Sequence, residues 1–218
     1  MTRKSVHFVR HGESLTNSTG FHHGPDVELT PRGVQQAELV AERLRLSPIE
    51  RIIVSPYERT MKTAVPIANA LKQEVEYSAL FVERRGPSEM RNRHGRDPKV
   101  QQIWKTIREH AHIPGWHYSD EENFDELLVR ARNALFFLES LPNSHVLVVS
   151  HGLFMKMIFA YVLLGDNLDG RVFWDRFIQA ENVENTGIMR LDYTDNYWNT
   201  AKFWKFISWN DHAHLSGK

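Results

Sequence analysis

The sequence predicts an α/β fold of three layers, in which a mixed, mainly parallel sheet lies between two layers of helices. Three short apolar runs at residues 5–9, 51–54 and 145–149 read as buried strands. Segments with apolar residues at helical spacing separate them, and strands that alternate with helices form parallel sheets covered on both faces. With no internal repeat or low-complexity linker, we expect a single domain over residues 1–218.

The first strand, residues 5–9, precedes a loop and then a clear helix start. Thr30 can cap a helix, and Pro31 suits its first turn because a proline there loses no backbone hydrogen bond. Apolar residues at helical spacing continue to about residue 46, which predicts a helix over 31–46.

The second strand, residues 51–54, is followed by Ser55 and Pro56, a second pairing of a cap with a first-turn proline. This pairing predicts a helix from Pro56 to about residue 71. Pro66 lies inside that segment and should kink the helix, because it removes one backbone hydrogen bond. A third short strand is expected over residues 75–80.

The middle of the chain loses regular periodicity and is polar, basic and rich in turn residues. We interpret residues 86–118 as a lid or insertion over the edge of the sheet, containing a helix at about 98–110. The segment Ser119–Glu122 has the spacing of a capping box and predicts the start of a helix that ends near residue 141.

The last third opens on the strand at 145–149 and a helix over 152–164. Two alternating segments, 182–192 and 201–209, look like further strands. Residues 210–218 are polar and are expected to fray.

The composition limits the partners that this chain can have. Lysine plus arginine equals aspartate plus glutamate at 27 each, so no net charge favours nucleic acid or an acidic membrane. The absence of cysteine excludes disulfides and thiolate metal sites. The N-terminus lacks a signal-peptide pattern, and no apolar run approaches the roughly 20 residues of a membrane span, so we expect a cytoplasmic protein.

Two of the predicted strands end in the same way. Arg10, His11 and Gly12 follow the first strand, and Ser150, His151 and Gly152 follow the strand at 145–149. Ligands of α/β proteins bind at the carboxyl ends of the strands. If these two strands are neighbours, both histidines lie at one edge of the sheet.

Arg59 should join this edge, because it lies in the opening turn of the helix after the second strand. Arg10 and Arg59 carry planar, permanently charged groups that fit phosphate. Together with His11 and His151 they would form a phosphate-sized cage, in which like charges repel unless a dianion is bound. Charge-assisted hydrogen bonds contribute roughly 1.5–3 kcal/mol each, so four such donors could hold a phosphoryl group.

Several motifs then occur in order at family-like spacing. They are RHGES with Asn17, D-x-x-L-T-x-x-G-x-x-Q-A at 26–37, SPYERTMKTA at 55–64, VSHG at 149–152 and Asn185 in the ENTGI segment. In this ordered set the sequence resembles the histidine phosphatase superfamily, which has the phosphoglycerate mutase-like fold. Residues 86–118 match that family only loosely.

The resemblance implies a role for each matched residue. His11 would be the nucleophile that becomes phosphohistidine, and Arg10, Arg59 and His151 would hold the phosphoryl oxygens and stabilise their charge in the transition state. Asn17 would add a neutral hydrogen-bond donor. From the chemistry of the residues we expect the arginines to lower the pKa of His11, and one ring nitrogen to donate to a backbone carbonyl.

Glu83 falls where the family places its general acid, which protonates the leaving alkoxide and then activates water. Glu89 lies six residues further on and is the competing candidate. Glu13 is expected to orient His11 or Arg10 rather than to react.

The implied activity is hydrolysis of a small phosphorylated metabolite by two in-line transfers, first to His11 and then to water. The alternatives are a phosphoglycerate mutase-type phosphotransferase and a non-catalytic protein that binds a phosphorylated ligand. The chemistry needs no metal or organic cofactor. A small phosphorylated substrate is the expected partner; oligomeric state stays open, with a homodimer as one option.

Other residues are candidates for substrate contacts. His23, beside His22 on the first loop, either contacts substrate or lies on a solvated loop, and we favour the solvated loop. The basic cluster after Glu83 is either a solvated lid face or a site that selects substrates with a second anionic group; it comprises Arg84, Arg85, Arg91, Arg93 and Arg96. The His-x-His pairs at 110–112 and 212–214 are not expected to bind metal. The six tryptophans are expected to pack in the core and the lid.

Overall fold

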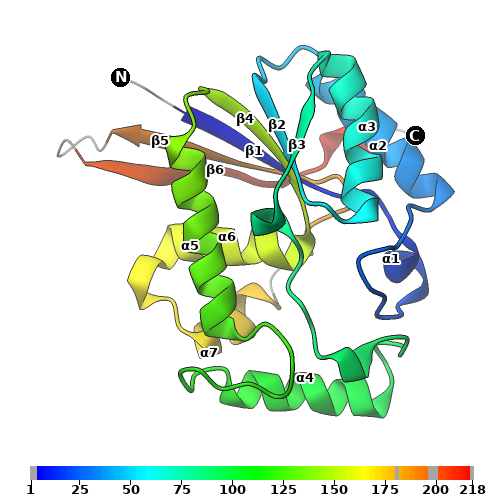
Figure 1. Cartoon of the computed structure of the whole chain (residues 1–218), viewed down its shortest axis with the longest axis vertical. Helices are drawn as coiled ribbons and strands as arrows, with labels where there is room; N and C mark the ends of the chain where they lie inside the picture. Colours follow the sequence, from blue (N-terminus) through cyan, green and yellow to red (C-terminus); the bar gives the residue numbers. More distant parts are fainter. Residues whose placement is uncertain (1–3, 180–181, 196–200, 217–218) are drawn as a thin grey trace.

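The computed structural model describes residues 4–179, 182–195 and 201–216 (Figure 1). These residues form one six-stranded sheet in the order β3-β2-β4-β1-β5-β6. The strands are β1 (Lys4–Arg10), β2 (Arg51–Val54), β3 (Val75–Tyr77), β4 (His145–Ser150), β5 (Ile188–Asp195) and β6 (Lys202–Asp211). The first four strands of that order are mutually parallel, whereas β5 runs antiparallel to both β1 and β6.

Helices cover both faces of the sheet, which confirms the predicted three-layer architecture. On one face lie α2 (Pro31–Leu44) and α3 (Glu58–Leu71) (Figure 1). They share a core with side chains of the sheet such as Ile52 and Val149. On the other face lie α5 (Phe124–Ser140) and α6 (Gly152–Leu164) (Figure 1). They share a core with Phe8, Val146 and Val148. Alternate residues of each buried strand therefore belong to different cores, as expected for a sheet covered twice.

The remaining elements are short, apart from one helix in the middle of the chain. They are α1 (Leu15–Thr19), η1 (Ala79–Phe81), η2 (Ser88–Met90), α4 (Pro98–His110), η3 (Gly165–Asn167), α7 (Gly170–Val172), the π-helical turn η4 (Phe173–Phe177) and η5 (Ala213–Leu215). The helix α4 matches its predicted range. Its buried residues Val100, Ile103 and Ile107 belong to the same core as α5 and α6, so this part of the 86–118 segment is packed against the body of the protein.

The predicted start of α2 is confirmed and that of α3 is wrong. Thr30 caps α2 by accepting a hydrogen bond from the Gly33 amide at 3.1 Å. The N-cap of α3 is Tyr57 rather than Ser55. The Ser55 hydroxyl cannot cap because it bonds His151 instead, at 2.8 Å. Pro66 lies inside α3, where the predicted kink stays a prediction.

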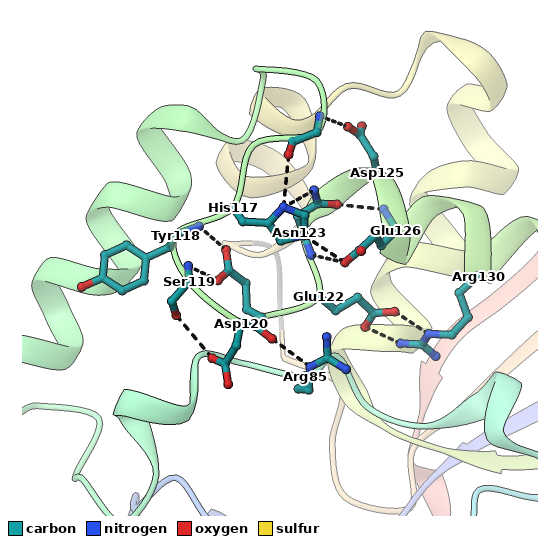
Figure 2. Close-up of polar contacts among 12 residues, drawn as sticks. Arg85, His117, Tyr118, Ser119, Asp120, Glu122, Asn123, Asp125, Glu126 and Arg130 are labelled. Atoms are coloured by element: carbon teal, nitrogen blue, oxygen red, sulfur yellow. Dashed lines mark hydrogen bonds and ion pairs between the residues drawn. The ribbon is translucent and has the colours of Figure 1, made fainter.

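The capping box of α5 also differs from the prediction. It consists of Asn123 and Glu126, whose side chains each bond the other's backbone amide, at 2.9 and 3.1 Å. Figure 2 shows these contacts and the turn before them. The predicted box at Ser119–Glu122 is a turn, in which Glu122 forms an ion pair with Arg130 of α5 at 2.6 Å. The segment has the right spacing, but Glu122 pairs with Arg130, and the Ser119 amide donates to Glu121 instead.

Three further predictions, on two strand boundaries and on the C-terminal residues, are wrong, and the local structure explains each one. The strand predicted at 75–80 ends at Tyr77, because Ser78 caps η1. The strand predicted from 182 begins only at Ile188, after a turn in which Thr186 adopts a φ of 61°. Residues 210–216 do not fray as predicted: Asn210 is 5% exposed, and His214 bonds the Thr186 hydroxyl at 2.9 Å. Residues 217–218 lie outside the described residues.

Within the described ranges, no helix combines the length and the apolar character needed to cross a membrane.

Candidate active site

The parallel pairing of β1 with β4 brings the two histidines together. Arg10 is in register with Ser150, and the His11 amide donates to the Ser150 carbonyl at 3.0 Å. The rings of His11 and His151, which follow these residues, lie 5.2 Å apart between centroids. The structure therefore confirms that both histidines lie side by side at the carboxyl edge of the sheet.

The loop after β1 is fixed by a close approach to the start of α2. A Cβ on Gly12 would lie 2.4 Å from the Gly33 carbonyl oxygen, and a Cβ on Gly33 would lie 2.0 Å from the Glu13 carbonyl oxygen. Only glycines fit at both positions. The Gly12 amide also donates to the Thr63 hydroxyl at 2.9 Å, which ties the loop to α3.

Glu13 belongs to this packing, and its predicted role is wrong. Its carboxylate accepts a hydrogen bond from Thr30 at 2.8 Å and lies 3.4 Å from Arg32. It therefore fastens the loop to the cap of α2 and does not orient His11 or Arg10 directly.

The ring of His11 is held in one tautomer. Its Nδ1 lies 2.7 Å from the Gly12 carbonyl oxygen, which can only accept, so Nδ1 carries the proton. Its Nε2 accepts a hydrogen bond from Arg59 Nε at 3.2 Å. Burial, followed by the charges of Arg59 and Arg10, lowers the pKa of His11 well below its ordinary 6.5. The result is a buried, neutral imidazole with an unprotonated Nε2, the form that a nucleophile requires.

The same site contains the two arginines and His151. Arg59 is the second residue of α3, and its guanidinium lies 5.1 Å from the centre of the Tyr57 ring. Arg10 donates through Nη1 to the Val183 carbonyl. His151 is fully buried behind His11, with its Nε2 2.8 Å from the Ser55 hydroxyl. Burial and the charge of Arg59 lower the pKa of His151 as well.

Two polar atoms at this point are buried without a hydrogen-bond partner among the described residues. They are Arg10 Nε and His151 Nδ1. Unsatisfied buried polar atoms are costly, and Arg10 Nε is a permanent donor, so their concentration around one imidazole points to an anionic ligand rather than to a structural network.

A cavity of about 310 Å³ opens at this edge. Among the residues that line it are His11, Arg10, Arg59, Asn17 and Glu83. His151 lies behind the wall rather than in it, with its ring against His11 and Tyr57. The cavity thus brings together the neutral imidazole of His11, the guanidinium groups of Arg10 and Arg59 and the carboxyl group of Glu83.

The structure separates the two candidates for the general acid. Glu83 lines the cavity, and its oxygens accept hydrogen bonds from the amides of Leu153 and Phe154 in the first turn of α6, at 3.2 and 3.0 Å. Glu89 is exposed and forms an ion pair with Lys99 at 3.2 Å. Only Glu83 lies where it could protonate a leaving group.

Asn17 is oriented by its neighbours. Its Oδ1 accepts hydrogen bonds from the Ser14 amide at 3.1 Å and from Asn185 Nδ2 at 3.2 Å. Asn185 also donates to the His11 carbonyl at 3.0 Å. Because Oδ1 is occupied in this way, Nδ2 is the donor that Asn17 could offer to a ligand in the cavity that it lines.

The peripheral candidates divide between the cavity and the surface. His23 is exposed, as favoured from the sequence, but both it and His22 line the cavity. Arg84, Arg85 and Arg91 also line it, whereas the cavity wall includes neither Arg93 nor Arg96. Among the described residues, no group of three or more histidine, aspartate or glutamate side chains is arranged to hold a metal ion.

Sequence reasoning assigned no role in the site to Ser55, Tyr57 or Thr63, although each supports it. Ser55 bonds His151, Tyr57 contacts Arg59 and His151, and Thr63 receives the Gly12 amide. All three lie in the SPYERTMKTA motif, and Thr63 follows Arg59 by four residues, on the same side of α3. The shared motif, and for Thr63 its spacing from Arg59, are the sequence features from which these roles could have been predicted.

The lowered pKa of His11 gives a direct test. Since burial and two arginines oppose protonation, the ring should stay neutral well below pH 6.5 and titrate only under more acid conditions. A titration of the imidazole ¹⁵N shifts by NMR measures this midpoint. In an Arg59→Met variant the midpoint should move upward, because one opposing charge is gone. A wild-type midpoint at or above 6.5 would contradict the arrangement.

Comparison with known proteins agrees with this geometry. The model of the histidine phosphatase superfamily (branch 1) matches residues 6–205. A probable phosphoglycerate mutase GpmB of Photorhabdus laumondii is 32% identical over 214 residues, covering 96% of this chain and 94% of that protein. A protein of the same name from Yersinia enterocolitica is 33% identical over 217 residues, with the same coverage.

Solved structures share the fold at lower identity. A phosphoserine phosphatase of Entamoeba histolytica in complex with 3-phosphoglyceric acid superposes with a TM-score of 0.76 at 22% identity, covering 97% of this chain and 99% of that chain. A mycobacterial glucosyl-3-phosphoglycerate phosphatase with inorganic phosphate gives a TM-score of 0.74 at 20% identity, covering 98% and 100%. At these identities the similarity establishes the fold.

Proposed function

The chain belongs to the histidine phosphatase superfamily, whose members are phosphatases and mutases, and from this premise we propose that it hydrolyses small phosphomonoesters through a phosphohistidine on His11. One observation carries the proposal. The unprotonated Nε2 of His11 lies beside Arg59 in a cavity that also holds the carboxyl group of Glu83. Nucleophile, charge stabiliser and proton donor thus share one small space.

In the first step, His11 Nε2 attacks the phosphorus and the bond from phosphorus to the ester oxygen breaks. Arg10 and Arg59 neutralise the charge on the three equatorial oxygens, with Asn17 as a further donor. In this proposal His151 accepts a hydrogen bond from the Ser55 hydroxyl at Nε2, so that its buried Nδ1 carries the proton and is also a donor. Glu83 gives its proton to the departing oxygen, which leaves as an alcohol.

In the second step, Glu83 is a carboxylate and takes a proton from a water molecule. The water oxygen attacks the phosphorus in line with the bond from phosphorus to Nε2, and inorganic phosphate leaves. His11 returns to its neutral form, with its Nδ1 proton still held by the Gly12 carbonyl. Glu83 is protonated again, so the cycle closes without metal or organic cofactor.

A phosphoglycerate mutase-type phosphotransferase is the second candidate, and the names of the 31–33% identical relatives favour it. The residues of the first step would be the same. The difference lies in the fate of the phosphohistidine, which a mutase returns to a reoriented substrate before water can attack. A non-catalytic protein that binds a phosphorylated ligand is the third candidate.

One set of assays separates the three candidates. Hydrolysis of p-nitrophenyl phosphate in the presence of EDTA, with an acid-labile and base-stable phosphoprotein trapped on His11, is the result expected for a phosphatase. Interconversion of 2- and 3-phosphoglycerate that depends on a bisphosphate primer, with little release of phosphate, would identify a mutase instead. Tight binding of phosphate esters with neither activity would leave only the binding protein.

A further inference from the structure

We propose that Arg84 binds a second anionic group of the substrate, so that the preferred substrates are phosphomonoesters that also carry a carboxylate or another phosphate. This inference rests on the proposed function, since it concerns the far end of the same cavity.

Arg84 lies where it could bind the part of the substrate next to the reacting bond. It directly follows Glu83, and its backbone amide donates to Glu83 Oε1 at 2.9 Å. Its side chain is 6% exposed and lines the same cavity as His11. A group bound by Arg84 therefore belongs to the molecule whose leaving oxygen faces Glu83.

The guanidinium of Arg84 contacts two tryptophan rings, but its hydrogen bonds are incomplete. It lies 5.4 Å from the ring centre of Trp104 in α4 and 5.1 Å from that of Trp174 in η4. Its Nε and Nη2 are buried and have no partner among the described residues. These two atoms form one side of the planar fork, which matches the paired oxygens of a carboxylate or a phosphate.

No acidic side chain completes this arrangement within the described residues. Glu121 exerts the strongest attraction on Arg84, but its carboxylate accepts hydrogen bonds from the amides of Tyr118 and Ser119, at 2.6 and 2.8 Å. A buried charge with unsatisfied donors is costly for a purely structural role. An anionic group that enters from the cavity would supply the missing acceptor.

Apart from Glu83, the other charged residues that line the cavity near Arg84 are also positive. Among the described residues that line the cavity, Glu83 provides the one carboxylate, whereas Arg85 and Arg91 add two exposed guanidinium groups near Arg84. Arg85 is steadied by a bond from its Nε to the Asp120 carbonyl at 3.0 Å (Figure 2). In a protein of zero net charge, this is a local concentration of positive charge beyond the two arginines expected to hold the phosphoryl group.

The decisive experiment compares substrates that differ by one anionic group. 3-Phosphoglycerate and glycerol 3-phosphate differ by a carboxylate, and fructose 1,6-bisphosphate and fructose 6-phosphate differ by a phosphate. For each pair we define selectivity as the ratio of kcat/KM for the more anionic member over the other. A ratio of about 10 to 100 is expected for at least one pair, the range that one or two charge-assisted hydrogen bonds supply. If the first pair shows this ratio, the second anionic group is a carboxylate; if the second pair shows it, the group is a phosphate.

Variants connect this selectivity to Arg84. In Arg84→Met the ratio should fall about 10- to 100-fold, and Arg84→Lys should restore only part of it, because a lysine lacks the fork. Arg93→Met is the matched control: Arg93 belongs to the same basic cluster but pairs with Asp97 at 2.9 Å and lies outside the cavity wall. Its ratio should equal that of the wild type.

Two results would overturn the inference. One is a wild-type ratio near unity for both pairs. The other is an Arg84→Met enzyme in which both members of a pair lose activity equally while Tm falls, which would make Arg84 a structural tether of the lid. If the protein turns over no phosphomonoester, calorimetry on His11→Ala still decides: 3-phosphoglycerate must bind more tightly than glycerol 3-phosphate, and the added Arg84→Met must remove the difference.

Discussion

Replacing His11 by alanine is expected to lower kcat/KM for p-nitrophenyl phosphate by on the order of 10⁴- to 10⁶-fold, because the covalent route through phosphohistidine disappears. The remaining cage could still bind the phosphate group, so binding should survive where turnover does not. Steady-state assays measure the loss, and acid-labile phosphoprotein should be absent from the variant.

His112→Ala is the matched control for this variant. His112 is exposed and lies outside the cavity wall, so both turnover and phosphoprotein should match the wild type. If His11→Ala kept a tenth of the activity, or if phosphoprotein still formed, another residue would be the nucleophile. A comparison of Tm values ensures that a lost activity is not a lost fold.

The strands and the main helices could be predicted from the sequence because their signals are local. Apolar runs gave β1, β2 and β4, and the Thr30 cap with Pro31 gave α2. The errors arose where a side chain with the right local spacing was engaged by a distant partner. Ser55 looked like a cap, but it bonds His151, which lies 96 residues away in the chain.

The candidate site could be predicted in outline for a related reason. In a parallel sheet the carboxyl ends of neighbouring strands meet, so two similar strand ends predicted the approach of His11 and His151. Glu13 shows the limit of that reasoning. Its place beside His11 suggested an orienting role, but its carboxylate bonds Thr30 at the cap of α2, where the loop packs closely against Gly33. Such packing of one loop against another helix leaves no local pattern in the sequence.

Replacing Glu83 by glutamine should reduce the rate of phosphoryl transfer from glycerol 3-phosphate to His11 by about 10²- to 10⁴-fold, the usual contribution of a general acid. An alkoxide is a poor leaving group and needs the proton. p-Nitrophenolate leaves without help, so transfer from p-nitrophenyl phosphate should slow much less. Stopped-flow measurement of the first turnover compares the two substrates before hydrolysis of the phosphoenzyme limits the rate.

The same variant should also reveal the second role of Glu83. Without a carboxylate to activate water, the phosphohistidine should accumulate, and p-nitrophenyl phosphate should give a burst of one nitrophenolate per site followed by slow turnover. Glu89→Gln is the control, because Glu89 pairs with Lys99 outside the cavity wall and should show neither effect. Equal slowing of both substrates in the first turnover of Glu83→Gln would mean that Glu83 acts through its bonds to the start of α6, as a positioning residue, and that the proton comes from another group.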